Sequence, residues 1–326
     1  MKAAVFHKYG PPAQLSLEEL ATPVPEPEEV QVRVRAAAIN DFDIGLLRGE
    51  PLFLRLFTGL GRPKIQIAGC DIAGEISHVG AKVTRWKVGD RVYGDLSGGR
   101  FGGFAEFVCV KPEQLAAMPA QMNFIDAAGI PQAAVLAWQG LNCGGPPRDG
   151  MKILFNGAGG GVGTYGVQLA KLHDVEVTGV DSADKLAVMR EAGFDHVLDY
   201  RSQDFTRQGK HYDLIVDAKS NRSPFAYLRS LAPGGCYATV GGYAASYLTV
   251  ALLGSLLGMF TGKRLKMIGL KPNLDLDYFS RLYSEGRLRS FIDGPFPFAR
   301  IGEALQYYET ARHKGKIIID LSLPRG

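Results

Sequence analysis

The sequence predicts an α/β protein in which a doubly wound parallel sheet domain accompanies a smaller, distorted β-barrel domain. Three observations indicate this fold class. The chain has 326 residues, more than one domain usually contains. Short strands separated by glycine turns fill its first 110 residues, which is typical of a small barrel. From residue 153 onward, strands alternate with helices, which indicates βαβ units and a parallel sheet.

The amino-terminal strands are recognised by alternating apolar and polar residues between turns. Residues 31–37 have the period of a half-buried strand, and 72–79, 91–93 and 104–110 are further short strands. The proline-rich stretch 22–27 precedes them. Its prolines lack amide donors, so we expect it to be an extended surface connection.

The spacing of apolar residues changes near Pro119. Residues 123–142 have helical spacing of apolar residues, which Pro131 interrupts. The parallel sheet is then expected from strand 153–155, helix 162–172, strand 175–180, helix 183–192, strands 196–198 and 213–217, helix 224–231 and strand 237–240. The remainder is mixed, with regular segments at 265–268, 301–311 and 317–321.

Composition argues against several classes of protein. Lys and Arg number 37 against 33 Asp and Glu, and this small excess is spread along the chain, so we expect no nucleic-acid partner. The most apolar stretch, 247–260, is shorter than the roughly 20 residues of a membrane span and predicts a buried helix or a pocket wall. The amino terminus lacks the apolar core of a signal peptide, so we expect a cytoplasmic protein.

A glycine-rich loop lies between strand 153–155 and helix 162–172, where a dinucleotide-binding turn would stand. Its register is Ala-x-Gly-x-x-Gly, formed by Ala158, Gly159, Gly160, Gly161, Val162 and Gly163. Gly160 would let the backbone approach a pyrophosphate, and Gly163 would let the helix pack closely on the sheet. The helix amino terminus would offer free amides to the phosphates. The flanking strand and helix favour this interpretation over a purely structural loop.

The residues after the second strand of this unit bear on the choice of cofactor. Asp181 stands where an acidic residue binds the ribose 2′-hydroxyl of NAD, and its charge would repel the 2′-phosphate of NADP. Ser182, Lys185, Tyr200 and Arg201 offer hydroxyls and cations that would surround that phosphate. The alternative is that Lys185 is a solvated helix residue and Arg201 a loop residue. These signals conflict, and we expect NADPH as the cofactor with NADH as the alternative.

Several motifs occur in one order along nearly the whole chain: Asn40-Asp41-Phe42-Asp43, Gly69-Cys70-Asp71-Ile72-Ala73-Gly74, Val88-Gly89-Asp90-Arg91-Val92, Gly102-Gly103-Phe104-Ala105-Glu106, the glycine loop, Val197-Leu198-Asp199-Tyr200 and Gly315-Lys316-Ile317-Ile318. With these motifs the chain resembles the zinc-independent quinone oxidoreductases related to ζ-crystallin, a branch of the medium-chain dehydrogenase/reductase superfamily. The resemblance implies a GroES-like catalytic domain over residues 1–120, completed by 265–326, and a Rossmann dinucleotide-binding domain over 121–264.

The resemblance also implies that no metal is bound. Zinc alcohol dehydrogenases have Gly-His-Glu where this chain has Gly69-Cys70-Asp71, and a cysteine where it has Asp41. A catalytic zinc needs three protein ligands and an open position, which Cys70 and Asp71 alone do not supply. Cys70 is expected to be a small buried residue.

For the catalytic site, the resemblance places Asn40 and Asp43 at the floor of the cleft, and Gly241 and Gly242 beside the nicotinamide. The alternative for Asn40 and Asp43 is a turn or a helix cap. The sequence identifies no proton donor. Without a metal to polarise an alcohol, the chemistry left is hydride transfer to an electrophilic quinone or enone, for which the protein mainly supplies proximity and orientation.

The leading hypothesis is therefore an NADPH-dependent reductase of quinones or α,β-unsaturated carbonyls. An enoyl-thioester reductase is the alternative among enzymes, and a nucleotide-binding sensor or structural protein is the alternative without turnover. A homodimer is expected through Leu265–Ile268, because this strand follows the last βα unit and would lie at the edge of the sheet. The alternative is a monomer whose edge is shielded by Lys263, Arg264 and Lys266.

Elemental analysis of protein purified without a chelator tests the expected absence of zinc. Because the ligand set is incomplete and the four cysteines contain no Cys-x-x-Cys, we expect less than stoichiometric zinc. One bound zinc per chain would overturn the resemblance to the zinc-independent branch.

Overall fold

The computed structural model describes residues 1–242 and 244–322, except for the side chains of residues 244–248, 251, 253, 255 and 256. The chain divides into two compact units, unit 1 with residues 1–132 and 272–326, and unit 2 with residues 133–271. These divisions fall later than the expected positions after residues 120 and 264. The reason is that α3 (Phe124–Gly129) packs on strands of unit 1, whereas β13 (Arg264–Met267) pairs with β12 (Leu231–Thr239) in unit 2.

Unit 1 is built on a mixed sheet. In the described chain its strands run β14-β15-β3-β4-β5-β7, with β6 paired to β3. Their bounds are β3 Val30–Ala38, β4 Asp71–Val79, β5 Arg91–Asp95, β6 Phe107–Val110, β7 Ala116–Ala117, β14 Ile292–Pro297 and β15 Lys316–Asp320. A separate hairpin joins β1 (Lys2–Val5) to β2 (Ser16–Glu19). Each strand expected from the sequence has its counterpart here, at 31–37, 72–79, 91–93 and 104–110.

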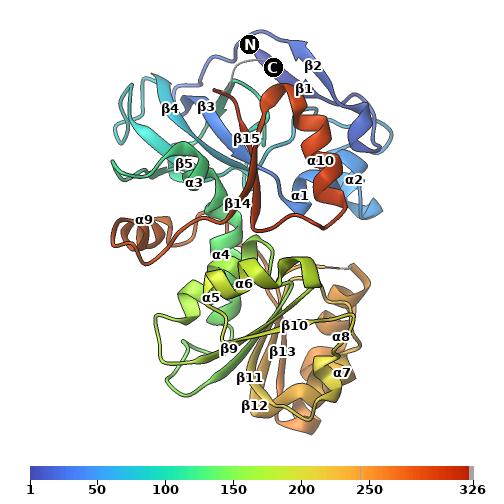
Figure 1. Cartoon of the computed structure of the whole chain (residues 1–326). Coiled ribbons are helices and arrows are strands. Elements are labelled where there is room, and N and C mark those ends of the chain that lie inside the picture. The colour runs from blue at the N-terminus through green and yellow to red at the C-terminus, as the bar shows by residue number, and fades with distance from the viewer. Residues whose placement is uncertain (243, 323–326) are drawn as a thin grey trace. The chain divides into compact units, whose positions relative to one another are not determined.

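The carboxyl-terminal segment completes unit 1. β15 lies antiparallel to β3, with Ile318 opposite Ala38, and β14 runs parallel to β15. Figure 1 shows this red segment and helix α10 (Ile301–Glu309) beside the blue amino-terminal strands and α1 (Asp41–Arg48). Ile317 and Ile319 are fully buried in the same core as Val32 and Ile72. The remaining helices of this unit are α2 (Arg55–Thr58) and α9 (Leu276–Ser284).

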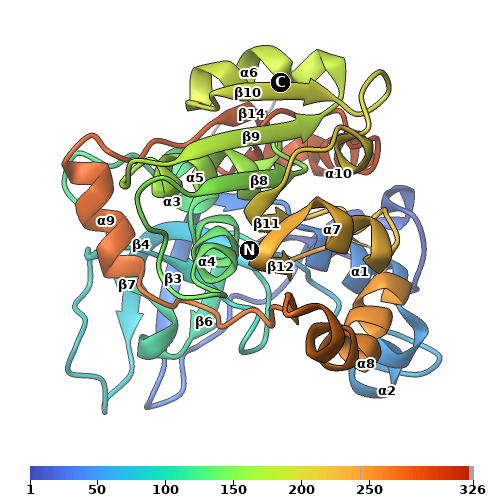
Figure 2. The same ribbon diagram turned by 90° about the horizontal axis from the view of Figure 1, so that it is seen from below.

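Unit 2 has the expected parallel sheet. Among the described residues six strands run in the order β10-β9-β8-β11-β12-β13, which is the 3-2-1-4-5-6 order of the Rossmann fold. Figure 2 shows the first five of them, from β10 to β12, in this order. The other strands and the helices are β8 Lys152–Asn156, β9 Glu176–Asp181, β10 His196–Asp199, β11 Tyr212–Asp217, α4 Pro131–Leu141, α5 Gly161–Ala170, α6 Leu186–Ala192, α7 Pro224–Ser230 and α8 Ala244–Thr261. The helix break at Pro131 falls where the sequence predicted it, between α3 and α4.

The strand order positions the site of unit 2. β8 is buried along Ile153–Asn156 because helices cover both faces of a parallel sheet. The order reverses between β8 and β11, so their connections leave the sheet in opposite directions. In such sheets ligands bind outside the carboxyl ends of the strands at this reversal. The glycine loop follows β8 at that end.

The expectation of a buried helix or a pocket wall over residues 247–260 is met in part as far as the described side chains show, because Val250 is buried in the core of unit 2 and Leu257 packs on that core. The segment forms α8, and the glycines Gly254 and Gly258 let it pack on the backbone of Leu265 and Lys263. On the described remainder of the helix, Leu252, Met259 and Phe260 are exposed. Hydropathy alone did not show which of these described side chains would be covered. In the described part of the chain, no helix is long and apolar enough to cross a membrane.

β13 is an edge strand, as the sequence analysis expected. Its inner side pairs with β12 in parallel register, with Thr239 opposite Met267. Leu265 is its one buried residue, while Arg264, Lys266 and Met267 are exposed. The amide of Ile268 donates to Thr239 O at 2.9 Å, so alternation along the strand directs the Met267 amide to the open edge.

Candidate functional site

The glycine loop of unit 2 is held close to the sheet by backbone contacts. The amides of Gly157 and Ala158 both donate to Val180 O, at 2.9 and 3.1 Å. A Cβ added at Gly163 would lie 2.3 Å from Ala158 O, so only glycine permits this approach of α5 to the loop. In the described part of the chain no side chain caps the helix start at Gly160, and a Cβ added there would have Gly157 O as its neighbour, at 3.6 Å. The first-turn amides of α5 have no carbonyl partner within the helix itself.

Asp181 and Lys185 form a buried pair beside this loop. The Asp181 carboxylate accepts from the amides of Gly159, at 2.9 Å, and Ser182, at 2.8 Å. The Lys185 Nζ atom lies 3.6 Å from Asp181 Oδ1. The Lys185 side chain is 1% exposed, and its stem packs on Gly159. The alternative of a solvated Lys185 is therefore wrong, because the amine finds an internal carboxylate.

The rim of this region is formed by the residues after β10. Tyr200 is exposed, and its amide donates to Asp181 O at 3.1 Å, so its backbone lies against the end of β9. The guanidinium of Arg201 lies 5.6 Å from the centroid of the Tyr200 ring. The structure thus brings Asp181, Ser182, Lys185 and Tyr200 together at the carboxyl ends of β9 and β10.

Gly241 and Gly242 form a tight turn after β12. Gly242 has φ +112°, and a Cβ there would lie 2.2 Å from Lys219 O, so the turn requires glycine. The Ser220 hydroxyl donates to Gly241 O at 2.8 Å. The two glycines are thereby fixed against the turn that follows β11.

Asp217, which was not predicted from the sequence, organises this edge of the sheet. Its Oδ1 accepts from the amides of Lys219 and Ser220, both at 2.8 Å, and from Asn156 Nδ2 at 2.9 Å. The Tyr237 hydroxyl donates to Asp217 Oδ2 at 3.0 Å. Burial raises the pKa of the Asp217 carboxyl. The signal that would have found it is an aspartate at the carboxyl end of strand 213–217, beside the strand that carries the glycine loop.

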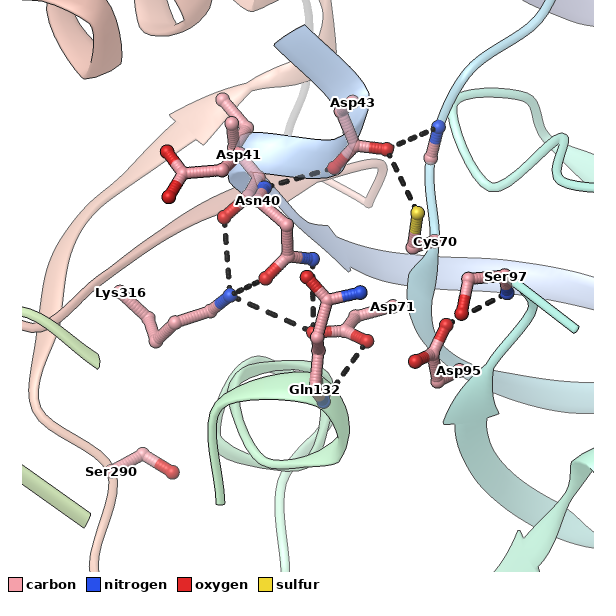
Figure 3. Close-up of polar contacts among 12 residues, drawn as sticks. Asn40, Asp41, Asp43, Cys70, Asp71, Asp95, Ser97, Gln132, Ser290 and Lys316 are labelled. Carbon is pink, nitrogen blue, oxygen red and sulfur yellow. Dashed lines mark hydrogen bonds and ion pairs between the residues drawn. The ribbon is translucent and has the colours of Figure 1, made fainter. Parts of the chain in front are cut away.

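In unit 1, Asn40 and Asp43 lie at the start of α1 (Figure 3). Asn40 precedes the first turn of α1, and its amide donates to Asp43 Oδ2 at 2.8 Å. The other oxygen of Asp43 accepts from the amide of Gly69 at 2.9 Å and from the Cys70 thiol at 3.3 Å. Asp43 is fully buried with both oxygens in use. It therefore caps the helix and also ties it to the segment before β4.

Asn40 also belongs to a buried charged group with Asp71 and Lys316, which the sequence analysis did not assign to the site. The side-chain nitrogen of Asn40, Nδ2, donates to Asp71 Oδ2 at 3.1 Å, and its side-chain oxygen, Oδ1, accepts from Lys316 Nζ at 2.5 Å. Lys316 Nζ donates to Ile39 O at 3.1 Å and lies 3.6 Å from Asp71 Oδ2. The Gln132 amide donates to Asp71 Oδ1 at 3.2 Å. Figure 3 shows these side chains converging from α1, β4, β15 and the start of α4.

Burial governs the protonation of this group. It raises the pKa of Asp71 to about 8, against the opposing effect of the Lys316 charge. It raises the pKa of Asp43 to about 6, against the donors that contact that carboxylate. Burial, with the neighbouring carboxylates, raises the pKa of the Cys70 thiol well above its usual value. Burial thus favours the protonated form of Asp71 against the attraction of the Lys316 ammonium, and Cys70 keeps its proton.

The described residues contain no group of three or more His, Cys, Asp or Glu side chains arranged to hold a metal ion. The structure gathers Asn40 and Asp43 in unit 1. It gathers the glycine loop with Asp181, Ser182, Lys185 and Tyr200 in unit 2. Gly241 and Gly242 lie at the carboxyl edge of the same sheet, where β12 ends.

A GroES-like unit and a Rossmann unit with a glycine loop define a dehydrogenase of the medium-chain class. Residues 26–120 match the family model of the alcohol dehydrogenase GroES-like domain, and residues 192–319 match that of the zinc-binding dehydrogenases. The chain is 31% identical to the chloroplast envelope quinone oxidoreductase homolog of Arabidopsis thaliana, covering 98% of each protein.

A second relative and a solved structure indicate the same branch of this superfamily. The chain is 29% identical to the NADPH-dependent alkenal/one oxidoreductase of Arabidopsis thaliana, covering 98% of this chain and 79% of that protein. The solved quinone oxidoreductase of Coxiella burnetii is 25% identical, with a TM-score of 0.87 over 98% of this chain and 99% of that one. The chain belongs to the quinone oxidoreductase and alkenal reductase branch of the medium-chain dehydrogenase/reductase superfamily, an NAD(P)H-dependent family.

The role of Asp43 as a buried acceptor predicts a loss of stability on Asp43→Asn. The new amide group would face the Asn40 or Gly69 amide with a donor, so we expect the free energy of unfolding to fall by about 1–3 kcal/mol. The urea midpoint measures this. Asp41→Asn is the matched control, because Asp41 is exposed and asparagine keeps an acceptor for the Tyr308 hydroxyl, which donates to it at 2.9 Å. Equal midpoints for the two variants would contradict the assigned contacts.

Proposed function

We propose that this protein is an NADPH-dependent reductase that transfers hydride to a quinone or an α,β-unsaturated carbonyl without zinc. The names of its relatives support the substrate class, since they include quinone oxidoreductase homologs, an alkenal/one oxidoreductase and a 2-methylene-furan-3-one reductase. The observation that carries the proposal is the glycine loop of unit 2, with its uncapped helix start and its open approach at Gly160.

The residues of unit 2 fit a dinucleotide. The first-turn amides of α5, with the partial positive charge of the helix start, would hold the pyrophosphate, and Gly160 leaves room for it. Gly241 and Gly242 would stand beside the nicotinamide, positioned by Ser220 and Asp217. When bound, the cofactor supplies the hydride. The protein supplies binding and orientation.

The pairing of Asp181 with Lys185 supports NADPH over NADH. A lone carboxylate would repel a 2′-phosphate, but here the ammonium of Lys185 offsets that charge. Ser182 and the exposed Tyr200 would complete the phosphate site with hydroxyl donors. NADH stays the alternative, because Asp181 retains acceptor capacity for a ribose hydroxyl.

In unit 1 we assign Asn40 and Asp43 to the floor of the substrate site, with Asp43 as a positioning residue because both of its oxygens are engaged. Zinc-free chemistry is supported by the residues at the positions of the zinc ligands of alcohol dehydrogenases. Asp71 already has the Lys316 ammonium as its partner. The Cys70 thiol donates a hydrogen bond to Asp43, and its raised pKa disfavours the thiolate that a metal would bind.

A single assay tests the activity. The purified protein is given NADPH or NADH with a panel of quinones, enones, enoyl thioesters and simple alcohols or aldehydes, and the absorbance of the reduced nicotinamide is followed. We expect turnover with quinones or enones and NADPH. Turnover confined to enoyl thioesters would instead support the thioester reductase, and cofactor binding without turnover would support a nucleotide-binding sensor.

Lys185→Met tests the cofactor preference, because methionine keeps the stem that packs on Gly159 and removes the charge. Losing a charge-assisted contact and leaving Asp181 unpaired should raise the KM for NADPH by about tenfold or more, while the KM for NADH stays nearly unchanged. Lys210→Met removes the same charge from an exposed position and is the control. Equal effects of Lys185→Met on both cofactors, or a native preference for NADH, would refute the assignment.

We also propose a homodimer through antiparallel pairing of β13 with its copy. The exposed edge strand needs a cover, and a two-fold partner supplies one. Met267→Pro removes the amide directed to the open edge and spares the pairing with β12, so it should split the dimer while the sheet stays folded.

Light scattering measures the mass of native protein and variant at micromolar concentration. Met267→Ala, which keeps the amide, should remain dimeric. A native mass near the 35.3 kDa of one chain would count against the pairing and would favour an edge shielded by its own cations.

A further inference from the structure

Two cysteines of unit 2 that play no part in the proposed reaction lie in direct contact. Cys143 follows α4, and Cys236 lies in β12. Their Sγ atoms are 2.8 Å apart, although 93 positions separate them in the chain. A disulfide bond is about 2.05 Å long, so the sulfurs have only about 0.75 Å to close. Cys143 is half-buried, which leaves an approach for a small reagent, whereas Cys236 is buried.

Two cations of the neighbouring strand face this pair. Arg264 pairs in register with Cys236 across the ladder, and its guanidinium donates to Gly144 O at 3.2 Å and Gly234 O at 3.3 Å. Lys266 Nζ donates to Cys143 O at 2.8 Å. The hydrogen bond from the Cys143 thiol and these two charges lower the pKa of Cys236. Cys236 therefore releases its proton more readily than an isolated buried thiol, whereas the hydrogen bond to Cys236 and burial raise the pKa of Cys143, which keeps its proton.

The other two cysteines lack this arrangement. Cys70 is fully buried, donates to the Asp43 carboxylate, and has a raised pKa. Burial and Glu29 raise the pKa of Cys109 to about 11. Oxidation is therefore expected to select the Cys143–Cys236 pair.

We propose that Cys143 and Cys236 are a modification site that forms a reversible intramolecular disulfide by exchange with a low-molecular-weight disulfide. In the first step the Cys236 thiolate takes the proton of the Cys143 thiol, and the more accessible Cys143 sulfur attacks the small disulfide. A mixed disulfide forms, the S–S bond of the reagent breaks, and one small thiol leaves with the proton. In the second step the Cys236 sulfur attacks Cys143, and a second small thiol leaves with the second proton. The protein loses two hydrogens and the reagent gains them.

The cross-link would join the end of α4 to the strand that leads to Gly241. It would close a loop of 93 positions, which restricts the unfolded chain more than the folded one. In a reducing compartment the pair would stay as two thiols and would close when small disulfides accumulate.

The experiment exposes the full-length protein to oxidised glutathione, alkylates the remaining thiols under denaturing conditions, and digests the protein without reduction for mass spectrometry. We expect an intact mass lower by two hydrogens before alkylation, a peptide pair joining Cys143 to Cys236, and alkylated Cys70 and Cys109. The oxidised protein should melt higher by on the order of 5 °C, and dithiothreitol should reverse the shift.

Variants separate the steps. Cys236→Ser should leave Cys143 holding glutathione as a lasting mixed disulfide, because the resolving thiol is gone. Cys109→Ser is the matched control and should form the cross-link like the native chain. Recovery of both cysteines as alkylated thiols or as separate glutathione adducts in the native protein would overturn the proposal, and so would a disulfide between chains. The native measurement decides the matter even where a variant fails to fold.

Discussion

Unit 1 depends on the buried ion pair between Asp71 and Lys316. Both side chains are almost fully enclosed, at 0% and 5% exposure, and burial disfavours the charged form of Asp71 while the Lys316 ammonium 3.6 Å away favours it. Asn40 bridges the two groups. Asp71 begins β4, Lys316 begins β15, and Asn40 precedes α1. The pair therefore requires the carboxyl-terminal strand to return to the amino-terminal sheet. Removing one of these groups would leave the other buried with neutral hydrogen-bond partners alone, at a cost of about 3–5 kcal/mol where the remaining group is charged.

At the carboxyl ends of the strands of unit 2, buried carboxylates likewise take hydrogen-bond partners from within the protein. Asp181 accepts from the amide of Gly159 in the glycine loop, and Asp217 accepts from the turn that positions Gly241. These carboxylates hold the backbone of the loops that a dinucleotide would contact. A structural role and a place in the site are therefore not alternatives for such residues. This holds also for Asp43, which caps α1 while it lies in the candidate site of unit 1.

Prediction from the sequence succeeded where the signal is local. Strand 153–155, the glycine loop and the helix after it follow from periodicity and from glycines whose Cβ would collide with neighbouring atoms, as at Gly163. Prediction was less complete for elements whose formation depends on pairing or packing with a segment distant in the sequence. The sequence analysis did not place α9, whose preceding residue Asp275 has a positive φ of 57°, or β14, which contains Gly294-Pro295 and is specified by its pairing with β15. The apolar run at 247–260 indicated burial, but hydropathy does not say which face of a helix is covered.

The sequence by itself determined the order of the elements, the Rossmann sheet with its glycine loop, the family, and the residue types offered to a cofactor. Tertiary structure alone decided which charges and sulfurs meet. Lys316 reaches Asn40 across 276 positions, and Cys143 meets Cys236 across 93. Lys185 is only four positions from Asp181, yet the sequence did not show that it is buried against the loop. The physical reason is that periodicity and turn preference act within a few residues, whereas a buried charge or thiol takes its partner and its pKa from neighbours that only the folded chain brings within contact.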